Sequence, residues 1–367
     1  GCDRPQRRLV AAPPAKAPPP SARLESAPAL GDALLAVLAH PAVASKEETV
    51  RRFDHEVQGA TVLRPYDGLF ADGPQDAAVL APRECGGRTG FALSNGFNPR
   101  YGAADPHDAA VSAVDEAIRN AVAVGANPDR LALLDNFCLG DPRRPETIWA
   151  LLAAARGCYE EALAQASPYI SGKDSFNNEY QGPDGLQMAI PPSLLISAIG
   201  IVPDPSATPG SDLKAEGDAL YLVGGFEPRL GASVYASLFG SPGGEGAVPA
   251  SPPQAHETYR ALHSAMRAGL VRACHDLSDG GLGAAAAEMC IGGRLGAALD
   301  LGALASSSGA SLSPELALFG ETNGSLLVEV GPEAKAGFEA ALGSLPCRLV
   351  GATGPDACLR VEAGGAG

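Results

Sequence analysis

Oxygen-bearing side chains recur along this chain in patterns that suit a magnesium-bound nucleotide. Glu116 and Asn120 are four residues apart, and a second group lies in the segment His275-Asp276-Leu277-Ser278-Asp279-Gly280-Gly281. Mg²⁺ takes hard oxygen ligands and usually needs only one or two protein carboxylates, because water and phosphate oxygens fill its other positions. These residue types therefore point to phosphate chemistry assisted by a divalent cation.

Two of these candidates also have a purely structural interpretation. Glu116 and Asn120 would share one face of a helix, where a metal can sit between them, but a solvent-exposed polar pair at this spacing is common. Asp76 closes a glycine-proline turn before an apolar strand, and as a turn residue it needs no function. Neither feature identifies a metal site by itself.

The segment 275–281 precedes a predicted helix at 281–290, so its hydroxyl, carboxylates and free N–H groups should meet at a helix N-terminus, a geometry that attracts anions. Ser278 or Asp279 could simply cap this helix, which explains part of the motif. Capping does not explain His275 and Asp276.

Two further candidates follow predicted strands. Asp135 ends the apolar strand 131–134, where a carboxylate suits a cleft better than a core. The segment Gly172-Lys173-Asp174-Ser175 follows another short strand, and we expect a turn in which the glycine allows close backbone approach while the lysine and serine face phosphate. This segment is not a Walker A loop, because that motif needs a longer glycine spacing before the lysine.

The elements that must position these residues alternate between strands and helices. Asp105-Pro106 predicts an N-cap followed by proline at the first helical position, with the helix continuing to about Val124. A capping box from Ser45 to Glu48 should open a short helix. In the first part we expect strands at 57–63, 77–81, 89–95, 130–135, 168–171 and 193–202 and a helix at 145–166. In the second part we expect strands at 219–224, 325–330 and 348–351 and helices at 257–268, 281–290 and 333–342.

Composition divides the chain into three parts. Residues 1–44 are rich in proline, alanine and serine, which is typical of a solvated linker. A proline-rich stretch at 203–210 separates a first folded domain, 45–203, from a second, 211–362. The expected fold class is α+β.

Charge and cysteine spacing exclude several kinds of partner. The formal charge of −15, with no basic stripe to offset it, argues against nucleic acid. None of the eight cysteines forms a C-x-x-C pair, which argues against a zinc cluster. The longest strongly apolar run, 194–202, is too short to span a bilayer, so no membrane partner is expected. We expect a soluble protein in a reducing cytoplasmic setting.

In their order along the chain, these residues resemble the second half of the synthetase part of phosphoribosylformylglycinamidine synthase, the formylglycinamide ribonucleotide amidotransferase of purine biosynthesis. The resemblance implies a two-domain fold similar to aminoimidazole ribonucleotide synthetase, with a β-sheet or half-barrel in the N-terminal domain and an α/β C-terminal domain. The segments that carry it are Ser45-Lys46-Glu47, Tyr66-Asp67-Gly68, Asn98-Pro99-Arg100-Tyr101, Val114–Asn120, Leu134–Gly140, Ile170–Ser175, Pro191-Pro192-Ser193 and His275–Gly281.

The same resemblance implies an ATP-dependent C–N ligase. ATP phosphorylates the formyl amide oxygen of formylglycinamide ribonucleotide, and ammonia from a glutaminase domain or subunit displaces the phosphate. The histidine held to be catalytic lies in the N-terminal synthetase half of the family, so the catalytic residues of this chain are unknown. That half is an expected partner, and we expect little turnover by this chain alone.

The resemblance also assigns roles to single residues. Lys173 stands where shorter family members carry an asparagine metal ligand, so we expect it to contact phosphate instead. The implied Mg²⁺ ligands are Asp76, Glu116, Asn120 and Asp276, the implied ATP contacts are Asp135, Gly172 and Ser278, and the implied substrate contact is Ser175.

Two alternative functions stay open. This half could hold a non-turning Mg-nucleotide that braces the fold, or the chain could be a small-molecule kinase of the same superfamily with its own acceptor site. The chain begins Gly-Cys-Asp rather than with methionine, which leads us to expect a fragment of a longer polypeptide.

Overall fold

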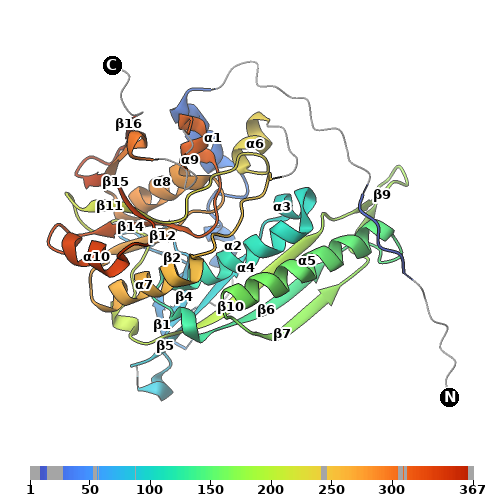
Figure 1. Cartoon of the computed structure of the whole chain (residues 1–367), viewed down its shortest axis with the longest axis horizontal. Helices are drawn as coiled ribbons and strands as arrows, with labels where there is room; N and C mark the ends of the chain where they lie inside the picture. Colours follow the sequence, from blue (N-terminus) through green and yellow to red (C-terminus); the bar gives the residue numbers. More distant parts are fainter. Residues whose placement is uncertain are drawn as a thin grey trace.

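The computed structural model describes residues 9–14, 28–52, 56, 58–86, 88–240, 246–304, 309 and 312–362. Over these residues the chain forms two six-stranded sheets with helices packed on them. Helix α4 (Pro106–Ala123) lies between the two halves and contacts strands of both sheets (Figure 1). The α+β fold class predicted from the sequence is confirmed.

The first sheet is antiparallel except at one edge, where β6 and β7 run parallel. Helices α4 and α5 (Pro145–Ala164) cover one face of it (Figure 1), and α3 (Pro99–Ala104) leads into α4. In neighbour order the strands are β1 (Thr61–Leu63), β4 (Ala77–Leu80), β5 (Gly90–Gly96), β10 (Ser193–Val202), β6 (Leu131–Cys138) and β7 (Tyr169–Ser175). Two short hairpins accompany the sheet, formed by β2 (Tyr66–Asp67) with β3 (Gly73–Pro74) and by β8 (Glu179–Gln181) with β9 (Gln187–Ala189).

The apolar run at 194–202 forms the centre of this sheet. Strand β10 pairs with β5 on one side and with β6 on the other, and alternate residues of it are buried. This alternation is typical of a strand with one face against helices. Among the residues that the structure describes, no helix combines the length and apolarity needed to cross a bilayer.

Helix α4 is buried on nearly all sides. The Asp105 carboxylate accepts the N–H groups of His107 and Asp108 at 2.9 and 3.1 Å, and Pro106 occupies the first helical turn, as predicted. Fourteen of its eighteen residues are buried. Many of them are alanines, whose small side chains let the first sheet and the second domain approach the same helix closely.

The second sheet is sandwiched between two helical layers. Alternate residues of its central strand β11 point to different layers: Tyr221 and Val223 join the cluster that contains α4 and α7, whereas Leu220 and Leu222 join the cluster around α8. The strands in neighbour order are β12 (Ala273–Asp276), β14 (Ser325–Val330), β11 (Ala219–Gly224), β15 (Cys347–Gly354), β13 (Gly296–Asp300) and β16 (Leu359–Glu362). The helices are α6 (Val234–Phe239), α7 (Ala255–Arg267), α8 (Gly281–Gly293), α9 (Pro314–Phe319) and α10 (Lys335–Leu342).

The expectation that residues 1–44 form an extended linker is wrong over its last part. Helix α1 (Leu30–Ala39) packs with Ala33 and Val37 fully buried against the α8 cluster. The proline-rich composition of the segment concealed this helix, whose apolar residues recur at helical spacing. Residues 1–8 and 15–27 of the expected linker lie outside the described residues.

Two local predictions also differ from the structure. Ser45 does not form a capping box: α2 (Glu47–Val50) begins after Lys46, the Ser45 hydroxyl accepts only the Glu47 N–H at 3.2 Å, and Glu48 pairs with Arg52 instead. The segment 172–175 is not a turn but the end of strand β7. It stays extended because parallel pairing with β6 satisfies its backbone. Val57, at the start of the predicted strand 57–63, lies outside the described residues.

Candidate functional site

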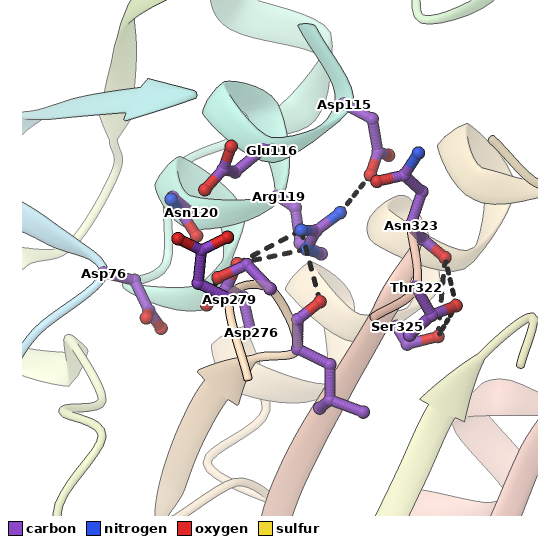
Figure 2. Close-up of polar contacts among 12 residues, drawn as sticks. Asp76, Asp115, Glu116, Arg119, Asn120, Asp276, Asp279, Thr322, Asn323 and Ser325 are labelled. Carbon is purple, nitrogen blue, oxygen red and sulfur yellow. Dashed lines mark hydrogen bonds and ion pairs between the residues drawn. The ribbon is translucent and has the colours of Figure 1, made fainter. Parts of the chain in front are cut away.

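Four of the predicted metal ligands meet in one place. Asp76 immediately precedes β4, Glu116 and Asn120 lie on consecutive turns of α4, and Asp276 ends β12 in the second domain. Figure 2 shows these side chains around a common space, with Asp279 beside them. These residues are up to 200 positions apart in the sequence. They converge because α4 packs directly against β12.

Asp76 presents one satisfied and one unsatisfied carboxylate oxygen. Its Oδ1 lies 2.6 Å from His275 Nδ1, while its buried Oδ2 has no hydrogen-bond partner. Burial raises the pKa of Asp76 to about 6, against the opposing effect of His275. Asp76, His275 and Asp276 each offer a ligand atom, and these atoms lie within 4.8 Å of one another.

Asn120 shows the same pattern. Its amide Nδ2 donates to the carbonyl of Asn95 at 3.0 Å, so its Oδ1 is left facing away from that strand. This oxygen is buried and has no partner. An unsatisfied buried oxygen costs about 1–3 kcal/mol, so two of them among the side chains of this cluster indicate a site for a group that supplies positive charge.

Glu116 adds a third carboxylate to this space. Its Oε2 accepts the Phe97 N–H at 2.9 Å. Burial, and next the negative charge of Asp276, raise the pKa of Glu116 to about 8, although Arg119 opposes the shift. A divalent cation bound here would favour the ionised forms of these carboxyl groups, and the oxygens of Asp76, Glu116, Asn120 and Asp276 match the preference of Mg²⁺.

Asp276 is held by a buried arginine that the sequence analysis assigned no role. Arg119 Nη2 and Nε lie 3.1 and 3.3 Å from Asp276 Oδ2, and the guanidinium is 1% exposed. The other oxygen, Oδ1, accepts the Ser278 hydroxyl at 3.3 Å. Ser278, predicted to contact ATP, therefore lies beside the carboxylate cluster.

The predicted cap of α8 is wrong. The helix begins after Gly280, whose φ of 84° suits glycine, and neither Ser278 nor Asp279 caps it through a side chain. Instead the buried carboxylate of Glu321 accepts the Gly280 N–H at 3.0 Å and the Val234 N–H at 2.8 Å. Glu321 comes from the loop before β14, so only the fold supplies this cap.

Asp279 is engaged by the segment Asn98–Tyr101, to which the sequence analysis gave no role beyond the family resemblance. Asn98 Nδ2 and Arg100 Nη2 donate to Asp279 Oδ1 at 2.8 and 2.6 Å, and the Tyr101 hydroxyl donates to Glu321. These bonds join α3 of the first domain to the loop before α8. The signal was present in the sequence as a cluster of polar and aromatic residues at a helix start.

The other predicted contacts lie elsewhere. Asp135 on β6 and Gly172 on β7 face each other, and Asp135 Oδ1 accepts the Lys173 N–H at 3.2 Å. A side chain at position 172 would collide with the Asp135 carboxylate, which explains the glycine. Lys173 Nζ donates to the Ser175 hydroxyl. Strands β10 and β6 separate the edge strand β7 from β5, and most of β7 is exposed.

Comparison with protein families identifies the class. Residues 74–202 match the N-terminal domain of AIR synthase related proteins, and residues 215–362 match the C-terminal domain. The chain therefore belongs to the AIR synthase related family.

Its curated relatives are more specific. The chain is 36% identical over 330 residues to the phosphoribosylformylglycinamidine synthase subunit PurL of Deinococcus radiodurans, covering 88% of this chain and 42% of that relative. It is 35% identical over 334 residues to PurL of Methanothermobacter marburgensis, covering 89% and 43%. The chain thus spans less than half the length of these relatives.

Solved structures share the fold at low identity. T. maritima PurL complexed with FGAR superimposes with a TM-score of 0.69 at 17% identity, covering 92% of this chain and 51% of that one. A chain of the HypE–HypF complex superimposes with a TM-score of 0.62 at 15% identity, covering 87% and 95%. The two-domain AIR synthase-like fold predicted from the sequence is confirmed.

Proposed function

We propose that this chain is a Mg-nucleotide-binding half of a PurL-type synthetase. In this role it takes part in the ATP-dependent conversion of formylglycinamide ribonucleotide to formylglycinamidine ribonucleotide, with ammonia supplied by a glutaminase. Support comes from the PurL names of the curated relatives and from solved PurL chains of the same fold whose titles include FGAR and ATP.

The observation that carries this proposal is the pair of unsatisfied buried oxygens, Asp76 Oδ2 and Asn120 Oδ1. They lie in the same cluster as Glu116 and Asp276 (Figure 2). Mg²⁺ bound there would satisfy both oxygens and would leave positions for phosphate oxygens and water. The cation would supply charge stabilisation of the transferring phosphoryl group, as in other phosphoryl transfers.

The chain's own residues have distinct tasks in this scheme. The carboxylates would hold the cation, and the Ser278 hydroxyl, which donates to Asp276 Oδ1 at 3.3 Å, would contact a nucleotide phosphate. Away from the carboxylate cluster, at the exposed edge of the first sheet, Asp135 and Gly172 would contact ATP and Ser175 would contact the substrate. The acceptor oxygen receives the phosphoryl group, and ammonia then forms the new C–N bond as phosphate leaves.

One face of the first sheet exposes apolar side chains that could form an interface with another part of the synthetase. Leu93 on β5, Leu134 on β6 and Ile199 on β10 are 36–46% exposed on the face opposite α4. Val62 on β1 and Ile170 on the edge strand β7 are exposed as well. An apolar sheet face of this extent is typical of an interface. We propose that the N-terminal synthetase half covers it and completes the ATP and substrate contacts.

A second candidate is a nucleotide that stays bound without turnover. The exposure of strand β7 favours this candidate. The predicted ATP and substrate contacts Gly172 and Ser175 lie on that strand, and no other described part of this chain encloses them for a reaction. In that case the carboxylate cluster would hold a Mg-nucleotide that stabilises the fold by mass action.

Two measurements test these proposals. A steady-state assay with ATP, formylglycinamide ribonucleotide and ammonia should show little turnover by this chain alone and turnover once the N-terminal half is added. Denaturing the purified chain and analysing the released small molecules should reveal ADP if the nucleotide is structural. If titration calorimetry shows no Mg-nucleotide binding and denaturation releases no ADP, both functions are excluded.

A further inference from the structure

Arg119 is the largest side chain that is fully buried in the described part of the chain. It lies on α4 between the two carboxylates Asp115 and Asp276, which come from different domains. Nη1 donates to Asp115 Oδ2, and Nη2 and Nε donate to Asp276 Oδ2. Nη2 also approaches the Leu277 carbonyl at 3.5 Å. All three guanidinium nitrogens are thus engaged.

Asp115, the anchor of this arginine, is fixed from the far side of the helix. The Tyr259 hydroxyl on α7 donates to Asp115 Oδ1, and the Gly324 N–H donates to Asp115 Oδ2 at 2.9 Å. Figure 2 shows Asp115 pointing toward the loop that carries Asn323 and Ser325, on the opposite side of Arg119 from Asp276. The guanidinium therefore has one orientation, set by three separate elements.

This orientation decides what Asp276 can offer to a ligand. Two N–H groups of Arg119 occupy Oδ2, whereas Oδ1 has only the Ser278 hydroxyl at 3.3 Å and His275 Nδ1 at 3.8 Å. Oδ1 thus faces His275, which forms a group of possible ligand atoms with Asp76 and Asp276. A carboxylate held in this way can give a cation one oxygen, not two.

We propose that Arg119 is a positioning residue for the cation site, holding Asp276 so that only Oδ1 reaches the metal. The inference rests on the proposed function, since it requires that the carboxylate cluster bind a divalent cation. Arg119 itself touches neither cation nor nucleotide. It fixes the orientation of the Asp276 carboxylate. Because α7 and the 321–325 loop hold Asp115, and Asp115 holds Arg119, the positions of these two elements also determine that orientation.

A positioning role and a simple charge role predict different results. A guanidinium near a cation repels it, so if charge were its only effect, Arg119 would weaken metal binding and Arg119→Lys would leave the affinity unchanged. A lysine keeps the charge but has a single ammonium, which cannot reproduce the planar fork between two carboxylates. The substitution Arg119→Lys therefore isolates geometry from charge.

The experiment uses Mn²⁺ as a spectroscopic probe of the purified chain. Electron paramagnetic resonance gives the free Mn²⁺ concentration and the line shape of the bound ion. We expect Arg119→Lys to weaken Mn²⁺ binding by about 10-fold or more, as expected for loss of a partner that orients a metal ligand, and to change the bound line shape. A matched control is Arg272→Lys, because Arg272 in the second domain forms a similar fork with Asp218 and Glu333. This control should bind Mn²⁺ as the unmodified chain does.

A second variant covers the case in which Arg119→Lys does not fold. Asp115→Asn removes the anchor of Arg119 without touching Asp276, and should weaken Mn²⁺ binding by about 3-fold to 10-fold through the same change in orientation. Unchanged affinity in whichever of these variants folds, or an equal loss in Arg272→Lys, would overturn the positioning role while leaving the cation site intact. Failure of the unmodified chain to bind Mn²⁺ would instead overturn the proposed function, and this inference with it.

Discussion

The two groups of predicted site residues differ in how completely this chain builds their surroundings. Asp76, Glu116, Asn120 and Asp276 are enclosed by elements of both domains, with buried oxygens that lack partners. Asp135, Gly172 and Ser175 lie along an exposed sheet edge where they contact mainly one another and Lys173. The first region is enclosed on several sides by elements of this chain, whereas the second is bordered by the sheet edge alone. The two regions therefore differ in how far this chain encloses them.

The largest expected effect compares the two faces of the first sheet at neighbouring residues of β6. Leu133 is fully buried toward the helices, and Leu134 is 36% exposed on the open face. Leu133→Ala should lower the free energy of unfolding by about 2–5 kcal/mol through lost burial and a cavity. Leu134→Ala should lower it by less than about 1 kcal/mol. Urea denaturation measures both, and equal losses would show that the open face is already packed in this chain.

The next largest expected effect is on Mg²⁺ affinity, when a carboxylate of the enclosed region is replaced. Asp276→Asn keeps the size of the side chain but removes its charge, and should weaken Mg²⁺ binding by about 100-fold, the upper end of the cost of disturbing a partner of a metal ligand. Asp174→Asn on the exposed strand β7 is the matched control and should leave the affinity unchanged. Titration calorimetry with Mg²⁺ distinguishes them. Comparable losses in both variants would mean that exposed acidic residues bind the ion without a defined site.

A smaller effect concerns a buried carboxylate outside both regions. Glu329 accepts the N–H groups of Lys214 and Ala215, at 2.9–3.1 Å, and burial raises its pKa from 4.5 to about 8. A raised pKa means that the folded state holds the proton more tightly, so this stabilisation is present below pH 4.5 and is lost as the pH rises toward 8. The slope is at most about 1.4 kcal/mol per pH unit.

Glu329→Gln should therefore flatten the fall in stability between pH 5 and pH 8, as measured by denaturation at several pH values. Added Mg²⁺ should not alter the difference between this variant and the unmodified chain, because Glu329 has its partners within the fold. A difference that depended on Mg²⁺ would show that the enclosed cluster is not the only carboxylate group that responds to the ion.

The smallest expected effect concerns the open edge. Asp135→Asn and Ser175→Ala should change Mg-nucleotide binding by this chain alone by less than about 2-fold, since neither residue contacts the enclosed cluster. The same variants should reduce turnover once the N-terminal synthetase half is present. Calorimetry on the chain and assays on the assembled enzyme make the comparison. A large loss of nucleotide binding by the isolated chain would place the nucleotide at the sheet edge instead.

Much of the fold could be predicted from local signals. Asp105-Pro106 correctly predicted the start of α4, and the apolar run at 194–202 correctly predicted β10. Local signals failed where tertiary contacts decided the conformation. Composition predicted a linker where α1 packs its apolar stripe on the α8 cluster, and a glycine predicted a turn at 172 where pairing with β6 keeps the chain extended.

The sequence alone determined which side chains carry oxygen ligands and which helix holds two of them on one face, because capping and helical periodicity act over a few residues. Only the tertiary structure decided that α4 lies against β12 and that Arg119 takes one oxygen of Asp276. It also decided that Glu321 caps α8 from a distant loop. These contacts join residues more than 40 positions apart, and they depend on how two buried surfaces fit together, which no local pattern in the sequence encodes.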